Sequence, residues 1–407
     1  MQYIIYFFLL FFISSCSNNN KESKLQKTNI SNDLYNFEKY KNLDEYTNNY
    51  RKYIGKFRSG ISDLEIERLA PLTIKAKASC SKKNGFILVH GLSDSPFMMM
   101  DIANSINQKN PCSEINMPIL PGHALVPGAS LEATNEQWIS AINLAVKDMK
   151  NNNVDSITMI GFSTGSAVSL HHLLSNYNSS QDIKLALISP AFHLSLPWYK
   201  VPGLQLMSFI GNIKNSFGYM DKHEDLNPYK YESFSYNGVN ELHKLTNKIK
   251  KLLIKTNEIN NKIVLFASAE DSTINQQITF DLLRKYFKNI SDGVIYSPTT
   301  INNVPNGIEV KNPQNISERI VDLSHVSIPI SPLNVIFGKN AKINYGCLHY
   351  DNKDKADLFA SCKVLSEEFY FGETNKLNLG KYQKFSRIQY NPFYEDLIEK
   401  LLKFIQN

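Results

Sequence analysis

The stretch SITMIGFSTGSAVSLHHLLS, residues 156–175, combines three signals that together indicate the fold. Ser156–Ile160 is a short, mostly apolar run, which predicts a buried strand. Ser166–Ser175 is apolar over a longer stretch and predicts a helix. Between the two lies the pattern Gly-x-Ser-x-Gly, which predicts a sharp turn. A buried strand that leads directly into a helix is typical of a parallel sheet covered by helices.

The turn gives Ser163 a candidate role. A serine hydroxyl is a weak nucleophile, so it must project from the chain where a histidine can reach it. A strand-to-helix turn provides that exposure, and Gly161 and Gly165 allow the turn to pack closely. The helix end behind it adds a partial positive charge. We interpret Ser163 as a nucleophile, with a purely structural turn as the alternative.

The rest of the chain repeats the strand and helix pattern. Amphipathic spacing predicts helices over Asn135–Lys150, where Trp138 is expected in the core, and over Pro392–Ile405. Five more apolar runs predict strands: Gly85–Val89, Ile115–Ile119, Leu185–Ser189, Ile263–Ala267 and Val294–Ser297. This alternation predicts an α/β fold with a mostly parallel central sheet and helices on both faces.

Two long stretches interrupt the alternation. Residues from about 190 to 260 contain no clear strand and read as an inserted cap, because so long a connection is uncommon in a compact domain. Residues from about 299 to 383 read as a second insertion, placed before the C-terminal helix. We therefore expect one catalytic domain over residues 51–407, preceded by a tether and lead segment over 16–50.

Composition excludes some functions. The 407 residues carry a formal net charge of +6 and a hydrophobic fraction of 43%, as in an ordinary globular protein. Lys and Arg are spread along the chain, with no basic block interleaved with aromatic residues. Nucleic-acid binding is therefore not expected.

The N-terminus predicts export. Tyr3–Ile13 is an unbroken apolar run, too short to span a bilayer as a helix but of the length found in signal peptides. The closing residues Ile13-Ser14-Ser15-Cys16 resemble a bacterial lipoprotein signal, although Met1–Tyr3 lacks Lys and Arg. The resemblance implies removal of residues 1–15 and lipid attachment at Cys16. A short membrane anchor and a plain secretory signal are the alternatives.

Export changes the interpretation of the other four cysteines. In an oxidising compartment an even number of cysteines predicts disulfides. Three pairings are possible, and we favour Cys80–Cys112, which precede neighbouring predicted strands, together with Cys347–Cys362. A zinc site formed by His349 with cysteines is the alternative, but its ligand spacing fits no familiar pattern.

Two further motifs carry a family resemblance. His90-Gly91-Leu92-Ser93-Asp94-Ser95-Pro96 follows a predicted strand and resembles the oxyanion-hole loop of α/β-hydrolases. Leu120-Pro121-Gly122-His123 resembles a stretch of the bacterial carboxylesterase and monoacylglycerol-lipase branch, which has glycine where this chain has Ala124. The resemblance implies that the N–H groups of Leu92 and Thr164 bind the oxyanion. It gives His90 and His123 structural roles.

The same resemblance suggests the remaining catalytic residues, in the chain order Ser, Asp or Glu, then His. Asp271 follows the predicted strand Ile263–Ala267, where the family carries its acid. His325 lies in a Ser-His sequence that resembles the family's histidine loop. The alternatives are His349 for the base and, for the acid, Asp225, the adjacent Glu270, and Asp322, which is close to His325 in sequence.

These residues imply ester hydrolysis through an acyl-enzyme, with no metal or organic cofactor. Lipid-like esters, including lysophospholipids, are candidate substrates because the cap is apolar; simple packing of the cap is the alternative explanation. The cap residues concerned are Leu196, Trp198, Leu204, Met207 and Phe209. The alternative activities on the same fold are those of a thioesterase, an amidase or a peptidase. An alternative of a different class is a surface-binding lipoprotein with a vestigial site.

If the cell is Gram-negative, Ser17 after the lipidated cysteine favours the outer membrane. The sequence does not indicate the oligomeric state.

Overall fold

The computed structural model describes residues 24–179, 182–194, 198–223, 227–301, 304–351, 353–364 and 368–406. The apolar run Tyr3–Ile13 and Cys16 lie outside these residues, as do Leu196 and Asp225. Within the described residues, no helix combines the length and apolar character needed to cross a membrane.

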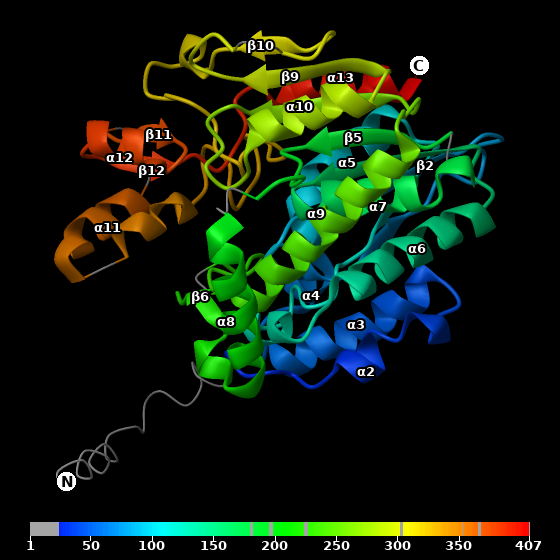
Figure 1. Cartoon of the computed structure of the whole chain (residues 1–407), viewed down its shortest axis with the longest axis horizontal. Helices are drawn as coiled ribbons and strands as arrows, with labels where there is room; N and C mark the ends of the chain where they lie inside the picture. The colour runs from blue at the N-terminus through cyan, green and yellow to red at the C-terminus, as the bar shows by residue number, and fades with distance from the viewer. Residues whose placement is uncertain are drawn as a thin grey trace, which may run out of the picture.

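An eight-stranded sheet forms the centre of the molecule (Figure 1), and its strand order is β1-β3-β2-β4-β5-β8-β9-β10. All neighbouring pairs are parallel except β1 and β3. The strands are β1 (Leu72–Ile74), β2 (Asn84–Val89), β3 (Ser113–Met117), β4 (Ser156–Phe162), β5 (Lys184–Ile188), β8 (Ile263–Ser268), β9 (Ile290–Tyr296) and β10 (Glu309–Lys311). The mostly parallel sheet is confirmed.

All six predicted strands are present, with shifted ends. β9 begins at Ile290 instead of Val294 because its first residues are polar or half-exposed and give no apolar signal. The two outermost strands, β1 and β10, were not predicted. Each has three residues and no fully buried position, so neither shows the pattern of a buried strand. β10 also lies within the predicted second insertion.

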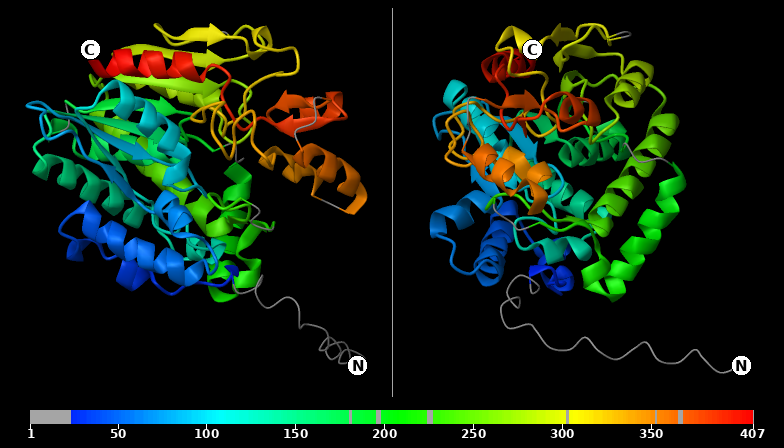
Figure 2. Two further views of the ribbon diagram at one scale, coloured as in Figure 1. Left: turned by 180° about the vertical axis from the view of Figure 1, so that it is seen from behind. Right: turned by 90° about the vertical axis from the view of Figure 1, so that its left-hand side faces the viewer.

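Helices cover both faces of the sheet (Figures 1 and 2). Alternating residues of β2 show the two sides: Ile87 belongs to one buried cluster and Phe86 to the other. The first cluster packs against α6 (Asn135–Asn151), α7 (Thr164–Ser175), α9 (Tyr236–Thr256) and α10 (Gln276–Tyr286). The second packs against α5 (Met100–Lys109) and α13 (Tyr394–Gln406).

Helix α6 bears out the prediction for its segment. Thr134 and Gln137 form a capping box at its start. Trp138 is buried, and its Nε1 donates to the carbonyl oxygen of Pro121 over 3.0 Å. Trp138 is therefore a core residue whose one polar atom is paired.

The lead segment is packed against the domain. Within residues 16–50 it contains α2 (Ser31–Leu34) and the first half of α3 (Leu43–Phe57), and α4 (Asp63–Leu69) follows within the predicted domain. Tyr46, Tyr50 and Ile54 recur every four residues along α3 and are fully buried. This spacing places them on one face of the helix, which binds the segment to the rest of the domain.

The predicted cap region contains two different parts. α8 (Val201–Ile213) and the hairpin of β6 (Tyr219–Asp221) and β7 (Phe234–Ser235) lie at the periphery of the molecule (Figure 1). α9, in contrast, buries Leu245 and Ile249 in the main core. The second half of the region thus covers the sheet directly.

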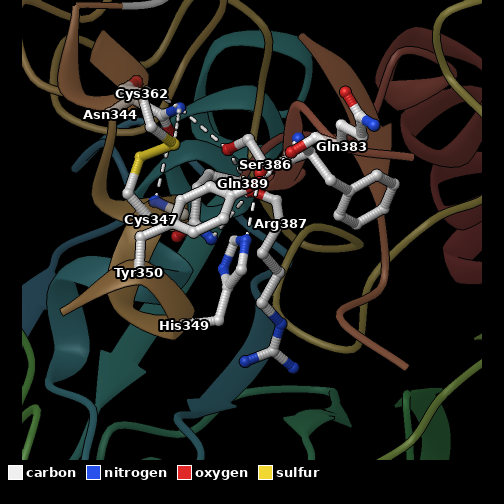
Figure 3. The surroundings of a disulfide bond; sticks show 11 residues. Asn344, Cys347, His349, Tyr350, Cys362, Gln383, Ser386, Arg387 and Gln389 are labelled. Carbon is white, nitrogen blue, oxygen red and sulfur yellow. Dashed lines mark hydrogen bonds between the residues drawn. A yellow bond between two sulfur atoms is a disulfide. The ribbon is translucent and has the colours of Figure 1, made fainter. Parts of the chain in front are cut away.

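The second insertion ends in a small lobe beside the sheet (Figure 1), formed by α11 (Ala356–Lys363), β11 (Tyr370–Gly372), α12 (Lys376–Lys381) and β12 (Phe385–Arg387). Its own buried cluster consists of Cys347, Tyr350, Cys362 and Phe369. Cys347 and Cys362 form a disulfide at the centre of this cluster (Figure 3). The second predicted disulfide, Cys80–Cys112, is also present.

The zinc alternative is wrong. Cys347 and Cys362 are bonded to each other, and Nε2 of His349 lies 3.1 Å from the carbonyl oxygen of Phe385. Across the described ranges, no group of three or more His, Cys, Asp or Glu side chains could hold a metal ion.

Removal of the Cys347–Cys362 disulfide should destabilise the lobe. The bond closes a loop with a sequence separation of 15, for which loop entropy gives about 3 kcal/mol. The Cys347→Ala/Cys362→Ala double variant is expected to lose about this free energy of unfolding in chemical denaturation. A double variant as stable as the wild type contradicts this expectation.

Candidate active site

Ser163 lies between β4 and α7 in a strained backbone conformation, with φ of 52° and ψ of −115°. Such a conformation in a non-glycine residue costs about 1–3 kcal/mol and persists only where its surroundings hold it. The N–H of Ser163 donates to the carbonyl oxygen of Ile188 over 2.9 Å. Its own carbonyl oxygen accepts from the N–H of Ala191 over 3.2 Å. These two bonds tie the turn to the end of β5.

Gly161 and Gly165 allow the close packing that the sequence predicts. A side chain at Gly161 would overlap the main chain of Ser166. One at Gly165 would overlap the carbonyl oxygens of Val89 and His90 at the end of β2. The start of α7 therefore approaches β2 more closely than a residue with a side chain permits.

His325 connects Ser163 with Asp271. Its Nε2 lies 2.9 Å from Ser163 Oγ, and its Nδ1 lies 2.5 Å from Asp271 Oδ2. All three side chains are buried. Because His325 donates a hydrogen bond from Nδ1–H to Asp271, Nε2 is unprotonated and its lone pair points toward the serine hydroxyl. The structure thus brings together the nucleophile, base and acid that the sequence suggests.

Asp271 is held by four hydrogen bonds. Besides His325, it accepts from the N–H groups of Thr273 and Ile274 and from the side chain of Gln276, over 2.8–2.9 Å. Burial raises the pKa of Asp271, but the charge of His325 and these hydrogen bonds outweigh burial and lower the pKa below its usual value. The carboxylate is therefore ionised at neutral pH.

The loop that carries His325 is fixed to the ends of two strands. Ser189, just after β5, donates through Oγ to the carbonyl oxygen of His325 over 3.1 Å. Ser268, at the end of β8, donates to the carbonyl oxygen of Leu323 over 2.6 Å. These bonds place the histidine over the carboxyl edge of the sheet.

The predicted oxyanion loop lies directly against the turn of Ser163. A side chain at Gly91 would overlap Asp94 and crowd Phe162, the residue before Ser163. This contact and the close approach at Gly165 place the loop of Leu92 next to the start of α7, which contains Thr164. Thr164 is the first residue of α7, where N–H groups have no acceptor within the helix.

His90 braces this loop. Its Nε2 accepts from the N–H of Leu120 over 3.0 Å, so its Nδ1 carries the proton and donates to the carbonyl oxygen of Gly91 over 2.8 Å. Burial and the neighbouring His123 lower the pKa of His90 well below its usual value. His90 is therefore neutral and is engaged at both ring nitrogens.

Part of the cap rests on the oxyanion loop. The N–H of Tyr231 donates to the carbonyl oxygen of Ser93 over 2.8 Å, and Lys230 Nζ lies 3.9 Å from Asp94 Oδ1. Burial raises the pKa of Asp94. The structure gives no hydrogen-bond partner for Asp94 Oδ1 or for the hydroxyls of Ser93 and Ser95 among the residues that it describes, and all three atoms are buried.

Glu373, from the second insertion, was not identified from the sequence. Its Oε2 accepts from the N–H of His325 over 3.0 Å and from Arg387 Nη2 over 3.2 Å. Arg387 Nε lies 3.0 Å from Oε1, an ion-pair contact without the alignment of a hydrogen bond. Glu373 is fully buried. It belongs to no motif, so no sequence signal connected it with His325.

Asp322 supports Glu373. Its Oδ1 accepts from the N–H of Glu373 over 2.6 Å, and its Oδ2 accepts from the side chain of Asn378 over 2.7 Å. Burial raises the pKa of Asp322 to about 7. Both oxygens of Asp322 are thus engaged with the insertion, and Asp271 is the acid that contacts the histidine ring.

Comparisons with known proteins show similarity in fold only. No family model matches the chain, and no curated protein matches its sequence. Among similar solved structures is a metagenome-derived lipolytic enzyme, with 15% sequence identity over 55% of this chain and 85% of that chain and a TM-score of 0.44. A monoacylglycerol lipase of Paleococcus ferrophilus has 13% identity over 60% of this chain and 88% of that chain, with a TM-score of 0.42. A soluble variant of the monoglyceride lipase of Saccharomyces cerevisiae has 10% identity over 60% of this chain and 82% of that chain, with a TM-score of 0.42. The sheet, its flanking helices and the turn at Ser163 confirm the predicted α/β-hydrolase fold.

Loss of the Glu373 carboxylate should destabilise the protein. Glu373→Ala leaves Arg387 without its ion pair and the N–H of His325 without its acceptor. Breaking a buried pair in this way costs about 3 kcal/mol or more, to be measured by chemical denaturation. Glu373→Gln is the matched control, because its amide oxygen still accepts from His325, and its loss should be smaller. An alanine variant as stable as the wild type rules out this role.

Proposed function

We propose that the protein is an exported, lipid-anchored serine hydrolase that cleaves carboxylic esters through an acyl-enzyme on Ser163. The observation that carries this proposal is the continuous chain from Ser163 Oγ to His325 Nε2 and from His325 Nδ1 to Asp271, at 2.9 and 2.5 Å. This is the arrangement that converts a hydroxyl into a nucleophile.

The geometry supports a two-step reaction. His325 Nε2 takes the hydroxyl proton while Ser163 Oγ bonds to the ester carbonyl carbon. The N–H groups of Leu92 and Thr164 stabilise the negative oxygen. The intermediate then expels the alcohol, which receives the proton from His325, and leaves the acyl group on Ser163. A water molecule, deprotonated by His325, attacks the acyl carbon. The resulting intermediate expels Ser163 Oγ, which takes the proton back from His325, and the carboxylic acid is released.

Asp271 and Glu373 act on His325 in different ways. Asp271 fixes the tautomer and stabilises the protonated imidazole, for which its lowered pKa suits it. Glu373 accepts a hydrogen bond from the main-chain N–H of His325 and thereby positions the whole residue. The second insertion is thus part of the support of the catalytic base.

The cap bears on the choice of ester. Leu204 is buried and Met207 is partly buried, so both remain candidates for contact with an acyl chain. Phe209 is exposed and does not support an internal pocket.

Export and anchoring rest on the sequence of residues 1–16. The run Tyr3–Ile13 and the closing Ser14-Ser15-Cys16 have the form of a lipoprotein signal. The disulfides Cys80–Cys112 and Cys347–Cys362 support an oxidising compartment. An outer-membrane location, for a Gram-negative cell, rests on Ser17 alone.

A fluorophosphonate probe tests the catalytic assignment. It should label the wild type and not Ser163→Ala. Asp271→Asn should lower kcat by roughly 10⁴-fold, since the wrong tautomer of His325 is then favoured. His349→Gln is the control, because this residue lies in the lobe, and its kcat should not change. Equal labelling of wild type and Ser163→Ala refutes the proposal.

A series of p-nitrophenyl esters tests the substrate class. If the apolar cap residues contact the acyl chain, kcat/KM should rise with chain length from acetate, by roughly 3-fold or more for each buried CH₂ group. Leu204→Ala should flatten this rise. Fastest turnover on acetate argues against lipid-like esters while leaving the esterase assignment intact.

A further inference from the structure

Helix α8 has an apolar face that is exposed. Leu204, Ser208 and Gly211 form the buried side of the helix. On another side, Leu206, Phe209 and Ile213 recur at helical spacing and are 58%, 62% and 74% exposed. Phe217 and Met220, which follow the helix, are also exposed. Large apolar side chains that gather on one exposed surface mark an interaction site.

The two charged residues that flank helix α8 are both lysines. α8 itself contains no Asp, Glu, Lys or Arg. Lys200 precedes it and Lys214 follows it, and both are exposed. An apolar helix face bordered by lysines is the pattern of a segment that lies in the interface of an anionic membrane.

The beginning of the described chain is fixed beside this helix. Lys27 Nζ donates to the carbonyl oxygen of Asn212 over 3.0 Å, and the side-chain amides of Gln26 and Asn215 lie 2.7 Å apart. The hydroxyl of Tyr219 donates to the carbonyl oxygen of Leu25 over 2.8 Å. The chain thus leaves the domain at the C-terminal end of α8.

The short distance from Cys16 limits where a membrane can lie. The eight residues from Cys16 to Ser23 span at most about 28 Å when fully extended. A lipid attached at Cys16 therefore holds the bilayer close to the C-terminal end of α8. Because the helix is only about 20 Å long, the whole of its exposed face lies near the bilayer.

From these observations we infer that the exposed face of α8, formed by Leu206, Phe209 and Ile213, docks on the surface of the lipid bilayer to which the chain is anchored. The inference rests on the lipid anchor of the proposed function. Lys230 and Tyr231, which precede β7, contact the predicted oxyanion loop. Docking of α8 thus brings the bilayer to the same cap region that contacts this loop.

A fluorescent label tests the docking without turnover. The full chain carries Phe209→Cys with an environment-sensitive nitrobenzoxadiazole label; Cys80, Cys112, Cys347 and Cys362 are held in disulfides. On vesicles of phosphatidylcholine with phosphatidylglycerol, the emission should shift to the blue and quenching by iodide should fall. The same label at Leu377→Cys, an exposed position in α12, should report no change.

Three outcomes overturn the inference. If the emission of the label at position 209 does not shift on vesicle-bound protein, α8 does not dock. If, without vesicles, the label is protected from iodide only at high protein concentration, a second copy covers the face. If it is protected from iodide in dilute protein without vesicles, another part of the same chain covers the face. The experiment is repeated in Ser163→Ala, so that failure of the esterase proposal and failure of the docking are distinguished.

A second measurement uses the reaction. In Leu206→Gln/Phe209→Gln/Ile213→Gln, hydrolysis of an ester held in vesicles should fall on the order of 10-fold or more, while hydrolysis of a dissolved ester should not change. The matched control replaces exposed apolar residues elsewhere: Ile254→Gln, Leu333→Gln and Leu377→Gln. Equal rates on vesicles for both triple variants contradict the docking.

Discussion

The strained backbone of Ser163 is the constraint on which the rest of the site depends. Its positive φ turns the chain from β4 into α7 within one residue and projects the hydroxyl at the carboxyl edge of the sheet. The conformation persists because Gly161 and Gly165 let the helix pack against β2 and because two main-chain bonds tie the turn to the end of β5. The same packing brings the predicted oxyanion loop beside Ser163.

The parallel sheet gathers the other residues at the same edge. Asp271 follows β8 and the loop of His325 is bonded to the ends of β5 and β8, so three segments that are distant in sequence converge. The second insertion adds Glu373, whose buried carboxylate joins the N–H of His325 to Arg387. The lobe and His325 are therefore connected through Glu373, and the disulfide Cys347–Cys362 lies at the centre of the lobe.

Local patterns predicted the elements that are buried and the residues that belong to motifs. β2, β4, β5 and β8 are mostly apolar runs, and the turn at Ser163 has a defined sequence. The edge strand β1 has three partly exposed residues, and its pairing with β3 depends on a neighbour that no local pattern reveals. The apolar character of α8 was visible in the sequence, but whether its side chains faced a pocket or solvent was not.

The sequence by itself determined the α/β sheet and the turn at Ser163, because strand burial and glycine tolerance leave local marks. It favoured the disulfides Cys80–Cys112 and Cys347–Cys362 among three possible pairings, and the structure confirms both. Only the tertiary structure decided which acidic residues serve His325, because hydrogen bonds join atoms that are far apart along the chain: Asp271 contacts the ring, and Glu373 holds the main chain. It also decided that Phe209 faces outward, because the exposure of a side chain depends on how neighbouring elements pack.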